Sequence, residues 1–375
     1  MSHGHAKPLP PSLREWAERV VGPLSAVQDA SHPRVSSRVW DVTGSRGRRF
    51  FIKQSASASF YERETFGYQS AVPALGFGRA PRLVETDARQ LALLLTAVPG
   101  TPVSRLTLPG PEHRSAHRQF GALLRRLHGT DKMPGAGRRE ARTALERLAD
   151  DAETHLARAT DLMSESRRAL VRRAADHVGK LTDLLAPAHI HGDAQERNVL
   201  WTGPALPGQR TPGQQAPGQR TPGQQAPVRQ APRQASGEAS GRQAPGQLAV
   251  IDFERSRYAP AVQDFVRLAC GPWQGRDDLR AAFFHGYGRP LTDAERQALP
   301  CLAALDAASC LAYGPDHGEH DVTARGLRTL ARLENGAWGD VRMTGRRVRP
   351  DRAHAAHASA TACAPRPRRS RPPRR

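Results

Sequence analysis

Lysine is the residue type that this sequence most clearly lacks. Among its 56 basic residues only Lys7, Lys53, Lys132 and Lys180 are lysines, and all the others are arginine. The chain is also rich in alanine, proline and glycine, so a coding sequence biased toward GC-rich codons explains most of this preference. A lysine that is kept inside an apolar strand of such a chain therefore favours a specific role.

Cysteine and long apolar runs are scarce too. The four cysteines form no CxxC pair, and Cys270, Cys301 and Cys310 fall in apolar helical stretches, which predicts small buried side chains rather than disulfides or a metal site. No stretch reaches 18 apolar residues, and residues 1–11 are polar and proline-rich with no signal-peptide pattern. We expect a cytoplasmic protein that does not associate with membranes.

Apolar residues are nearly absent from two segments. Residues 204–246 contain an identical ten-residue duplication, PGQRTPGQQA at 207–216 and 217–226, and residues 341–375 are rich in arginine. Neither segment has apolar side chains whose burial could offset the entropy of ordering, so we expect a disordered insertion and a disordered tail, together with a disordered start at 1–11. The folded part is expected to comprise an N-terminal lobe, 12–98, and a C-terminal lobe, 99–340.

The formal net charge of +20 raises the question of nucleic acid. Residues 342–375 carry a net +10 and residues 202–247 a net +4, which leaves about +6 for the folded part. The tail has no aromatic residues for base stacking. Nucleic-acid binding is therefore not the favoured interpretation, although a like-charged tail that binds nucleic acid or an acidic partner stays the alternative. The sequence does not define an oligomeric state.

Hydrophobic periodicity predicts a small strand-rich lobe followed by a helical one, an α+β chain. In the first lobe we expect a helix over 12–21 with Ser12 as N-cap, a hairpin of strands 35–43 and 49–53, a helix over 61–69 and a strand over 91–95. In the second we expect helices over 112–128, 138–157, 164–185, 261–270, 277–285, 292–313 and 322–333. Residues 198–201 and 248–253 are expected to pair as a hairpin around the insertion.

The strongest chemical signal is the segment from His191 to Asn198. Asp193 precedes Asn198 by five residues, and an apolar strand follows. This is the spacing of a kinase catalytic loop, in which the aspartate accepts the proton of the attacking hydroxyl and the asparagine holds magnesium. Asp252 ends the next ordered strand, where its carboxylate can bridge magnesium to nucleotide phosphates.

A nucleotide site is predicted upstream. Lys53 ends a strand and Glu64 follows on a helix, which favours a lysine that positions the α and β phosphates and is held by a glutamate. Glu62 is an alternative partner, and an ordinary surface lysine is the alternative to the whole arrangement. The phosphate loop has no glycine-rich pattern, so serine side chains or backbone N–H groups of the segment 30–37, with Ser36 and Ser37 as the candidate residues, would have to contact the phosphates.

Taken together, these motifs resemble the aminoglycoside phosphotransferase family of the kinase-like superfamily, which also includes choline, homoserine and fructosamine kinases. The matching segments are 51–53, 61–65, 93–100, 123–128, 191–200, 251–254 and 264–268. The resemblance implies a bilobal protein-kinase-like fold, with a small β-rich N-lobe and a larger, mainly helical C-lobe. It also implies roles for five residues: Asp193 as base, Asn198 and Asp252 on magnesium, His191 orienting the loop and Asp264 supporting it. Where family members often have glycine before the asparagine, this chain has Arg197.

The activity implied is transfer of the γ-phosphoryl group of ATP or GTP, with Mg²⁺, to a hydroxyl of a small molecule. An aminoglycoside acceptor, and hence antibiotic resistance, is one expectation and a metabolite kinase is another. A kinase-fold protein without catalysis, binding through its basic tail, is the third. A polycationic acceptor would need an acidic wall near the base, for which the candidates are Asp277, Asp278, Asp306, Asp316, Glu319 and Asp321.

Overall fold

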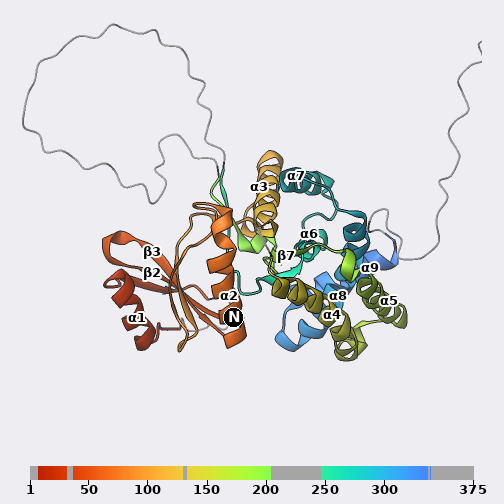
Figure 1. Cartoon of the computed structure of the whole chain (residues 1–375), viewed down its shortest axis with the longest axis horizontal. Helices are drawn as coiled ribbons and strands as arrows, with labels where there is room; N and C mark the ends of the chain where they lie inside the picture. Colours follow the sequence, from red (N-terminus) through yellow and green to blue (C-terminus); the bar gives the residue numbers. More distant parts are fainter. Residues whose placement is uncertain (1–6, 32–36, 130–132, 204–245, 337, 339–375) are drawn as a thin grey trace, which may run out of the picture. The chain divides into compact units, whose positions relative to one another are not determined.

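The structure is a computed structural model that describes residues 7–31, 37–129, 133–203, 246–336 and 338 (Figure 1). These residues belong to one compact unit. The segments 1–6, 204–245 and 341–375, all expected to be disordered, lie outside the described residues, and so does Cys363. None of the helices described is both long enough and apolar enough to cross a lipid bilayer.

The N-terminal lobe is built on a five-stranded antiparallel sheet with strand order β1-β2-β3-β5-β4. The expected hairpin is confirmed, because β2 and β3 pair with Trp40 opposite Ile52. The expected strand over 91–95 is β5. The sequence did not reveal the two edge strands, whose side chains are mostly exposed or half-buried and so carry no apolar alternation. The bounds are β1 Ala26–Asp29, β2 Ser37–Thr43, β3 Arg49–Ser55, β4 Leu83–Asp87 and β5 Ala92–Thr96.

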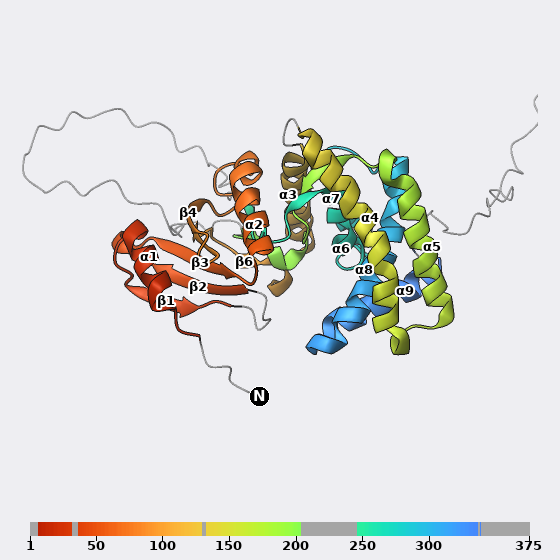
Figure 2. The same ribbon diagram turned by 60° about the horizontal axis from the view of Figure 1, so that its bottom comes forward.

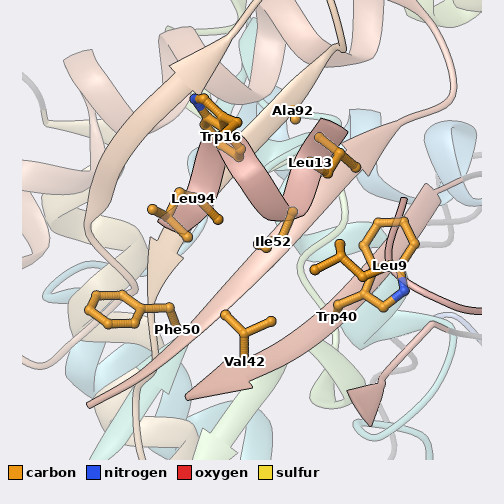
Figure 3. Packing of buried hydrophobic residues seen from close by; sticks show 10 residues of the cluster. Leu9, Leu13, Trp16, Trp40, Val42, Phe50, Ile52, Ala92 and Leu94 are labelled. Carbon is orange, nitrogen blue, oxygen red and sulfur yellow. The ribbon is translucent and has the colours of Figure 1, made fainter. Parts of the chain in front are cut away.

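Helix α1 (Pro11–Val21) covers one face of this sheet (Figure 3). Leu13 and Trp16 project from it into a core of buried side chains from β2, β3 and β5. The capping prediction was wrong: the helix begins at Pro11 with Pro10 as N-cap, and no side chain caps it. Proline fixes φ near the helical value and has no N–H to satisfy, so it is well suited to start a helix.

Residues 7–10, expected to be disordered, pack against the lobe instead. Leu9 is buried in the same core as Trp40. The backbone on either side of it is also held, because the Lys7 N–H donates to Asp29 and the Trp40 Nε1–H donates to the Lys7 carbonyl. One apolar residue among polar neighbours was too weak a pattern to predict this.

Helix α2 (Ala58–Ser70) carries Glu64, the predicted partner of Lys53, on the face that turns toward the sheet. Ser57 caps it, since the Ser57 hydroxyl accepts from the Phe60 N–H. Tyr61, Glu64 and Tyr68 lie on its buried face, whereas Glu62 is exposed. Because residues three and four apart share one face of a helix, burial of Tyr61 and Tyr68 also turns Glu64 inward.

The C-terminal lobe is helical, as expected. Helices α4, α5, α8 and α9 pack with one another, and α3 packs on α7 (Figure 2). The capping box of Thr292 and Glu295 at the start of α8 is present. The helix expected over 261–270 is mostly a 3₁₀ turn, and only four residues form α6. The bounds are α3 Gly110–His128, α4 Gly135–Arg158, α5 Glu165–Leu181, α6 Val266–Ala269, α7 Asp277–Tyr287, α8 Asp293–Tyr313 and α9 His320–Glu334.

Short strands frame the segment with the predicted chemistry. Strand β7 (Pro187–Ile190) pairs with β10 (Arg257–Pro260), and β8 (Val199–Trp201) pairs with β9 (Leu248–Val250) and with β6 (Thr101–Pro102). The hairpin predicted on either side of the insertion is therefore confirmed, with Val199 opposite Val250. The loop 191–198 joins β7 to β8, so both of its ends are anchored in sheets.

Candidate active site

The backbone of the loop 191–198 is held by one buried carboxylate. Asp264 accepts the N–H of His191 and the N–H of Gly192, both at 2.8 Å, and also contacts Nε2 of His128 at 3.0 Å. Burial alone would raise the pKa of Asp264, but the His128 contact and the two N–H groups hold it below its usual range. Asp264 is thus an ionised anchor beneath the loop, the position that the sequence assigned to it.

Gly192 is the residue that lets the loop approach its neighbours. Its φ is +78°, and a Cβ atom there would lie 2.2 Å from the carbonyl oxygen of Arg255. Both the left-handed backbone and the close contact exclude any larger side chain. A glycine is therefore required between His191 and Asp193.

His191 has both ring nitrogens engaged. Its Nδ1 accepts the N–H of Asp193 at 3.2 Å, and its Nε2 donates to the carbonyl of Ile251 at 3.0 Å. Burial lowers the pKa of His191, which agrees with a neutral ring protonated at Nε2. The ring thereby links Asp193 to the segment that precedes Asp252.

Asp193 is buried and surrounded by donors. Its Oδ2 accepts from Arg197 at 2.8 Å and from Nδ2 of Asn198 at 3.0 Å, and its Oδ1 forms an ion pair with Arg267. Nδ2 of Asn198 also donates to the Asp193 carbonyl. The amide oxygen of Asn198 is therefore the atom that is left to coordinate a metal ion. The two arginines were not predicted as partners of Asp193, because neither the turn at 197 nor the packing of α6 could be read from the spacing.

Lys53 brings the two lobes' motifs together. Its Nζ lies 2.9 Å from Oε2 of Glu64, 2.6 Å from Oδ1 of Asp252 and 3.1 Å from Oε2 of Glu254. Glu64 is therefore the helix partner, since Glu62 is exposed. Glu254 was missed as a partner, although it lies two residues after Asp252 and could have been considered on that ground.

Three carboxylates around one ammonium group leave an excess of negative charge. Burial raises the pKa of Glu64 to about 7 against the attraction of Lys53, and repulsion from Asp252 adds to the shift. Burial would raise the pKa of Asp252, but the charge of Lys53 and the hydrogen bond that it donates hold this pKa below its usual range. A further cation bound beside Lys53 and its three carboxylates would therefore be electrostatically favourable.

We expect Glu64 to make the protein less stable as pH rises. Between its unfolded pKa of 4.5 and its folded pKa of about 7, the folded state binds more protons, so this group's contribution to the free energy of unfolding falls by up to about 3 kcal/mol. Glu64→Gln cannot titrate and should flatten this decline. Chemical denaturation of both proteins at pH 4.5 to 8 measures it, and parallel curves for the two would contradict the assignment.

Asp252 has an unusual backbone conformation. Its φ is +69°, in the left-handed region that residues other than glycine rarely adopt. The bond from the Ile251 N–H to the Asn198 carbonyl, 3.0 Å, extends the β8–β9 ladder up to this residue. Such strain persists only where the surroundings impose it, and it is common at functional sites. The turned backbone accompanies a carboxylate that reaches Lys53 while it also lines the cleft.

Asn198 and Asp252 both line one open cleft of about 410 Å³. An amide oxygen and a carboxylate are hard oxygen ligands of the kind that Mg²⁺ prefers, in a site that shows excess negative charge. The residues therefore fit the predicted magnesium site. Of the predicted phosphate-loop residues, Ser37 lies beside it, since its hydroxyl donates to Glu254 at 2.9 Å. Ser36 lies outside the described residues.

The acidic wall expected of a polycation site does not form around this cleft. Of the six candidate acids only Asp306 lines it. Asp278 pairs with Arg276 and Arg114, and Asp316 pairs with Arg158. The charged side chains on the cleft wall are instead mostly arginines: Arg105, Arg197, Arg255, Arg267 and Arg325.

A second cluster holds the middle of the loop. Oε1 of Glu196 lies 2.6 Å from Nε2 of His113 and 3.0 Å from Nε2 of His117, one turn apart on α3. These are the three side chains that could together ligate a metal among the described residues. However, Trp273 donates its Nε1–H to Nδ1 of His117 at 3.3 Å, whereas a metal on Nε2 would leave a proton on Nδ1. The geometry favours hydrogen bonds that tie the loop to α3.

Comparison with known proteins bears on this geometry. Residues 32–208 match the model of a family described as the phosphotransferase enzyme family. The family resemblance predicted from the sequence is confirmed. No curated protein matched this sequence in the corresponding search.

Solved structures similar to this chain show the same fold. A thermostable mutant of aminoglycoside phosphotransferase APH(4)-Ia, in its apo form, is 13% identical with a TM-score of 0.55, and the match covers 87% of this chain and 99% of that one. The gentamicin complex of APH(2")-IIa is 12% identical with a TM-score of 0.52, covering 87% and 97%. The GDP and kanamycin complex of APH(2")-IIia is 14% identical with a TM-score of 0.53, covering 87% and 98%. The predicted bilobal α+β fold is thus confirmed.

Proposed function

We propose that this protein transfers the γ-phosphoryl group of ATP or GTP to a hydroxyl group of a small molecule. The observation that carries the proposal is the meeting of Lys53, Asp252, Asn198 and Asp193, which come from three separate parts of the chain, in a single charged site. This is the set of groups that phosphoryl transfer requires: a cation for the donor phosphates, metal ligands and a base. The nucleotide complexes among the similar enzymes, with GDP and with ADP, support a nucleotide donor.

Each side chain has a role in this proposal that follows from its contacts. Lys53, oriented by Glu64, binds the α and β phosphates, and Ser37 contacts the phosphates from the N-terminal lobe. Asn198 and Asp252 would hold magnesium, which neutralises charge on the phosphate oxygens when it is bound. Asp193 orients the acceptor hydroxyl and takes its proton. Asp264 and His191 keep the loop in place.

The test is magnesium-dependent transfer by the purified protein. With ATP or GTP and a panel of hydroxylated antibiotics and metabolites, we expect one acceptor class to gain the mass of a single phosphoryl group. A protein that binds nucleotide but transfers nothing to any acceptor, and consumes no nucleotide beyond the rate without protein, contradicts the proposal. Omission of magnesium is the matched control.

A further inference from the structure

The arginine-rich wall of the cleft is the feature that the proposed function does not explain. Of the three acids that line the cleft, Asp252 and Glu254 are within ion-pair distance of Lys53. Asp306, together with Asp193, which pairs with Arg197 and Arg267, remains to balance the five arginines of the wall. The described residues give neither Arg105 nor Arg255 an ion pair, so positive charge exceeds negative charge where the acceptor would bind.

Asp306 balances these charges poorly. It lies 3.7 Å from Nε of Arg267 and 3.6 Å from an NH group of Arg325, both longer than a hydrogen bond. Burial lowers the pKa of the Arg197 guanidinium; attraction to Asp252 opposes this shift, and repulsion from Arg325 adds to it. The guanidinium groups around Asp193 and Asp306 therefore face one another with too few carboxylates between them.

Arg325 also has an unused donor. Its Nε is buried and has no hydrogen-bond partner among the described residues, while one of its NH groups contacts Sγ of Cys310 at 3.0 Å. A buried charged donor without an acceptor is unfavourable unless a ligand supplies one. Arg325 also lines the cleft, where a bound anion would balance its charge.

A second, smaller cavity, of about 160 Å³, has the same character. It shares Arg255, Arg267 and Asp306 with the cleft and adds Arg257, together with Leu302 of α8 and other apolar side chains. The site thus continues from Asp193 into the helical lobe without gaining a further acid. A bound molecule could place apolar or hydroxylated parts there and its charge on the arginines.

We propose, on the basis of the proposed function, that the phosphoryl acceptor is an anion: a hydroxylated molecule whose carboxylate or phosphate group is bound by Arg197, Arg267 and Arg325. Arginine donates paired N–H groups that match the oxygens of either group. Binding of this anion gives Arg197 and Arg267 a new partner and frees Asp193 to receive the hydroxyl proton. A polycationic acceptor would be repelled by the same wall.

In the proposed transfer step one bond to the γ phosphorus forms and another breaks. The acceptor oxygen forms a bond to the γ phosphorus, and the bond from the γ phosphorus to the bridging oxygen breaks, with its electron pair leaving on the nucleoside diphosphate. The hydroxyl proton passes to Asp193. The anionic group of the acceptor takes no part in bond formation and serves only for binding and for release of Asp193 from its arginines.

The phosphates of the nucleotide donor are a second anionic group that these arginines could bind. Arg267 and Arg325 pair with Asp306 of α8, whereas the acids around Lys53 lie on α2 and on the segment after β9. Binding tests are therefore made with ADP and magnesium at saturation, so that any further anion has to occupy the acceptor side. Because these tests measure binding without turnover, their result is separate from success or failure of phosphoryl transfer.

Calorimetry with four hexoses of similar size tests the proposal: glucuronate, glucose 6-phosphate, glucose and glucosamine. We expect glucuronate or glucose 6-phosphate to bind more tightly than neutral glucose and cationic glucosamine. Arg325→Gln should weaken anion binding roughly tenfold or more, and Arg328→Gln, an exposed arginine on the same helix, should not. Both variants are first shown to unfold at the wild-type temperature.

Three outcomes overturn the proposal: tighter binding of glucosamine or kanamycin than of the anions, no binding of either anion, or equal anion binding by the Arg325 and Arg328 variants. If Arg325→Gln unfolds early, Arg197→Gly provides the second variant, because Arg197 is half-exposed on a loop position where related sequences often have glycine. Loss of anion preference in that variant supports the proposal, and an unchanged preference contradicts it.

Discussion

Asp193→Asn is expected to lower the rate of phosphoryl transfer by about a hundredfold to ten-thousandfold. Asparagine has the same shape and can still accept a hydrogen bond, but it cannot take a proton from the acceptor hydroxyl. Because Asp193 contacts none of the carboxylates around Lys53, nucleotide binding should stay within about twofold of wild type by this argument. Steady-state transfer rates and nucleotide titrations measure the two effects separately.

The control for Asp193→Asn is Asp277→Asn, which removes an exposed acid at the start of α7. It should transfer phosphate at the wild-type rate. Since Asp193 also balances Arg197 and Arg267, its loss is expected to destabilise the fold, so rates are compared at a temperature at which both variants are folded. Turnover by Asp193→Asn at the wild-type rate would exclude Asp193 as the base.

Asp252→Asn is expected to have an effect of similar size by a different route. The substitution removes a charged magnesium ligand, and transfer should fall by at least about a hundredfold. Asparagine tolerates the left-handed backbone that residue 252 adopts, so the main chain is expected to keep its path. Lys53 retains Glu64 and Glu254 as partners.

The diagnostic measurement for Asp252→Asn is nucleotide affinity with and without magnesium. In the wild type, magnesium should tighten nucleotide binding; in the variant, this gain should be largely lost while metal-free binding changes little. Glu62→Gln, an exposed carboxylate on α2, is the matched control and should behave as the wild type does. If magnesium tightens binding equally in Asp252→Asn, the carboxylate is not a ligand.

Much of the site could be predicted because its residues sit at the ends of regular elements. Lys53 lies two residues before the end of β3, Asp252 follows β9, and Asp193 and Asn198 share a loop, so their spacing from the predicted strands was enough to identify them as candidates. Lys53 and Asp252 are 199 residues apart in sequence yet 2.6 Å apart in space. The apolar patterns of the strands beside these two residues, rather than their separation in the sequence, indicated that both belong to the site.

Other features depended on packing that no local pattern records. The ion pairs of Asp193 with Arg197 and Arg267 require the loop, the short α6 and their mutual orientation at once. The helix expected over 261–270 is interrupted because Asp264, within a 3₁₀ turn, bonds to the loop backbone instead of facing solvent. In both cases a contact between distant segments overrides the local preference.

The paired residues of the β8–β9 hairpin, rather than separation along the sequence, set where the site residues lie. Three pairs of residues, from Val199 opposite Val250 to Trp201 opposite Leu248, set where Asn198 and Asp252 emerge. Lengthening a connection adds only slowly to the entropy of closing it. Two residues proposed to hold one metal can therefore be coded far apart in the sequence and still meet beside a short, paired hairpin.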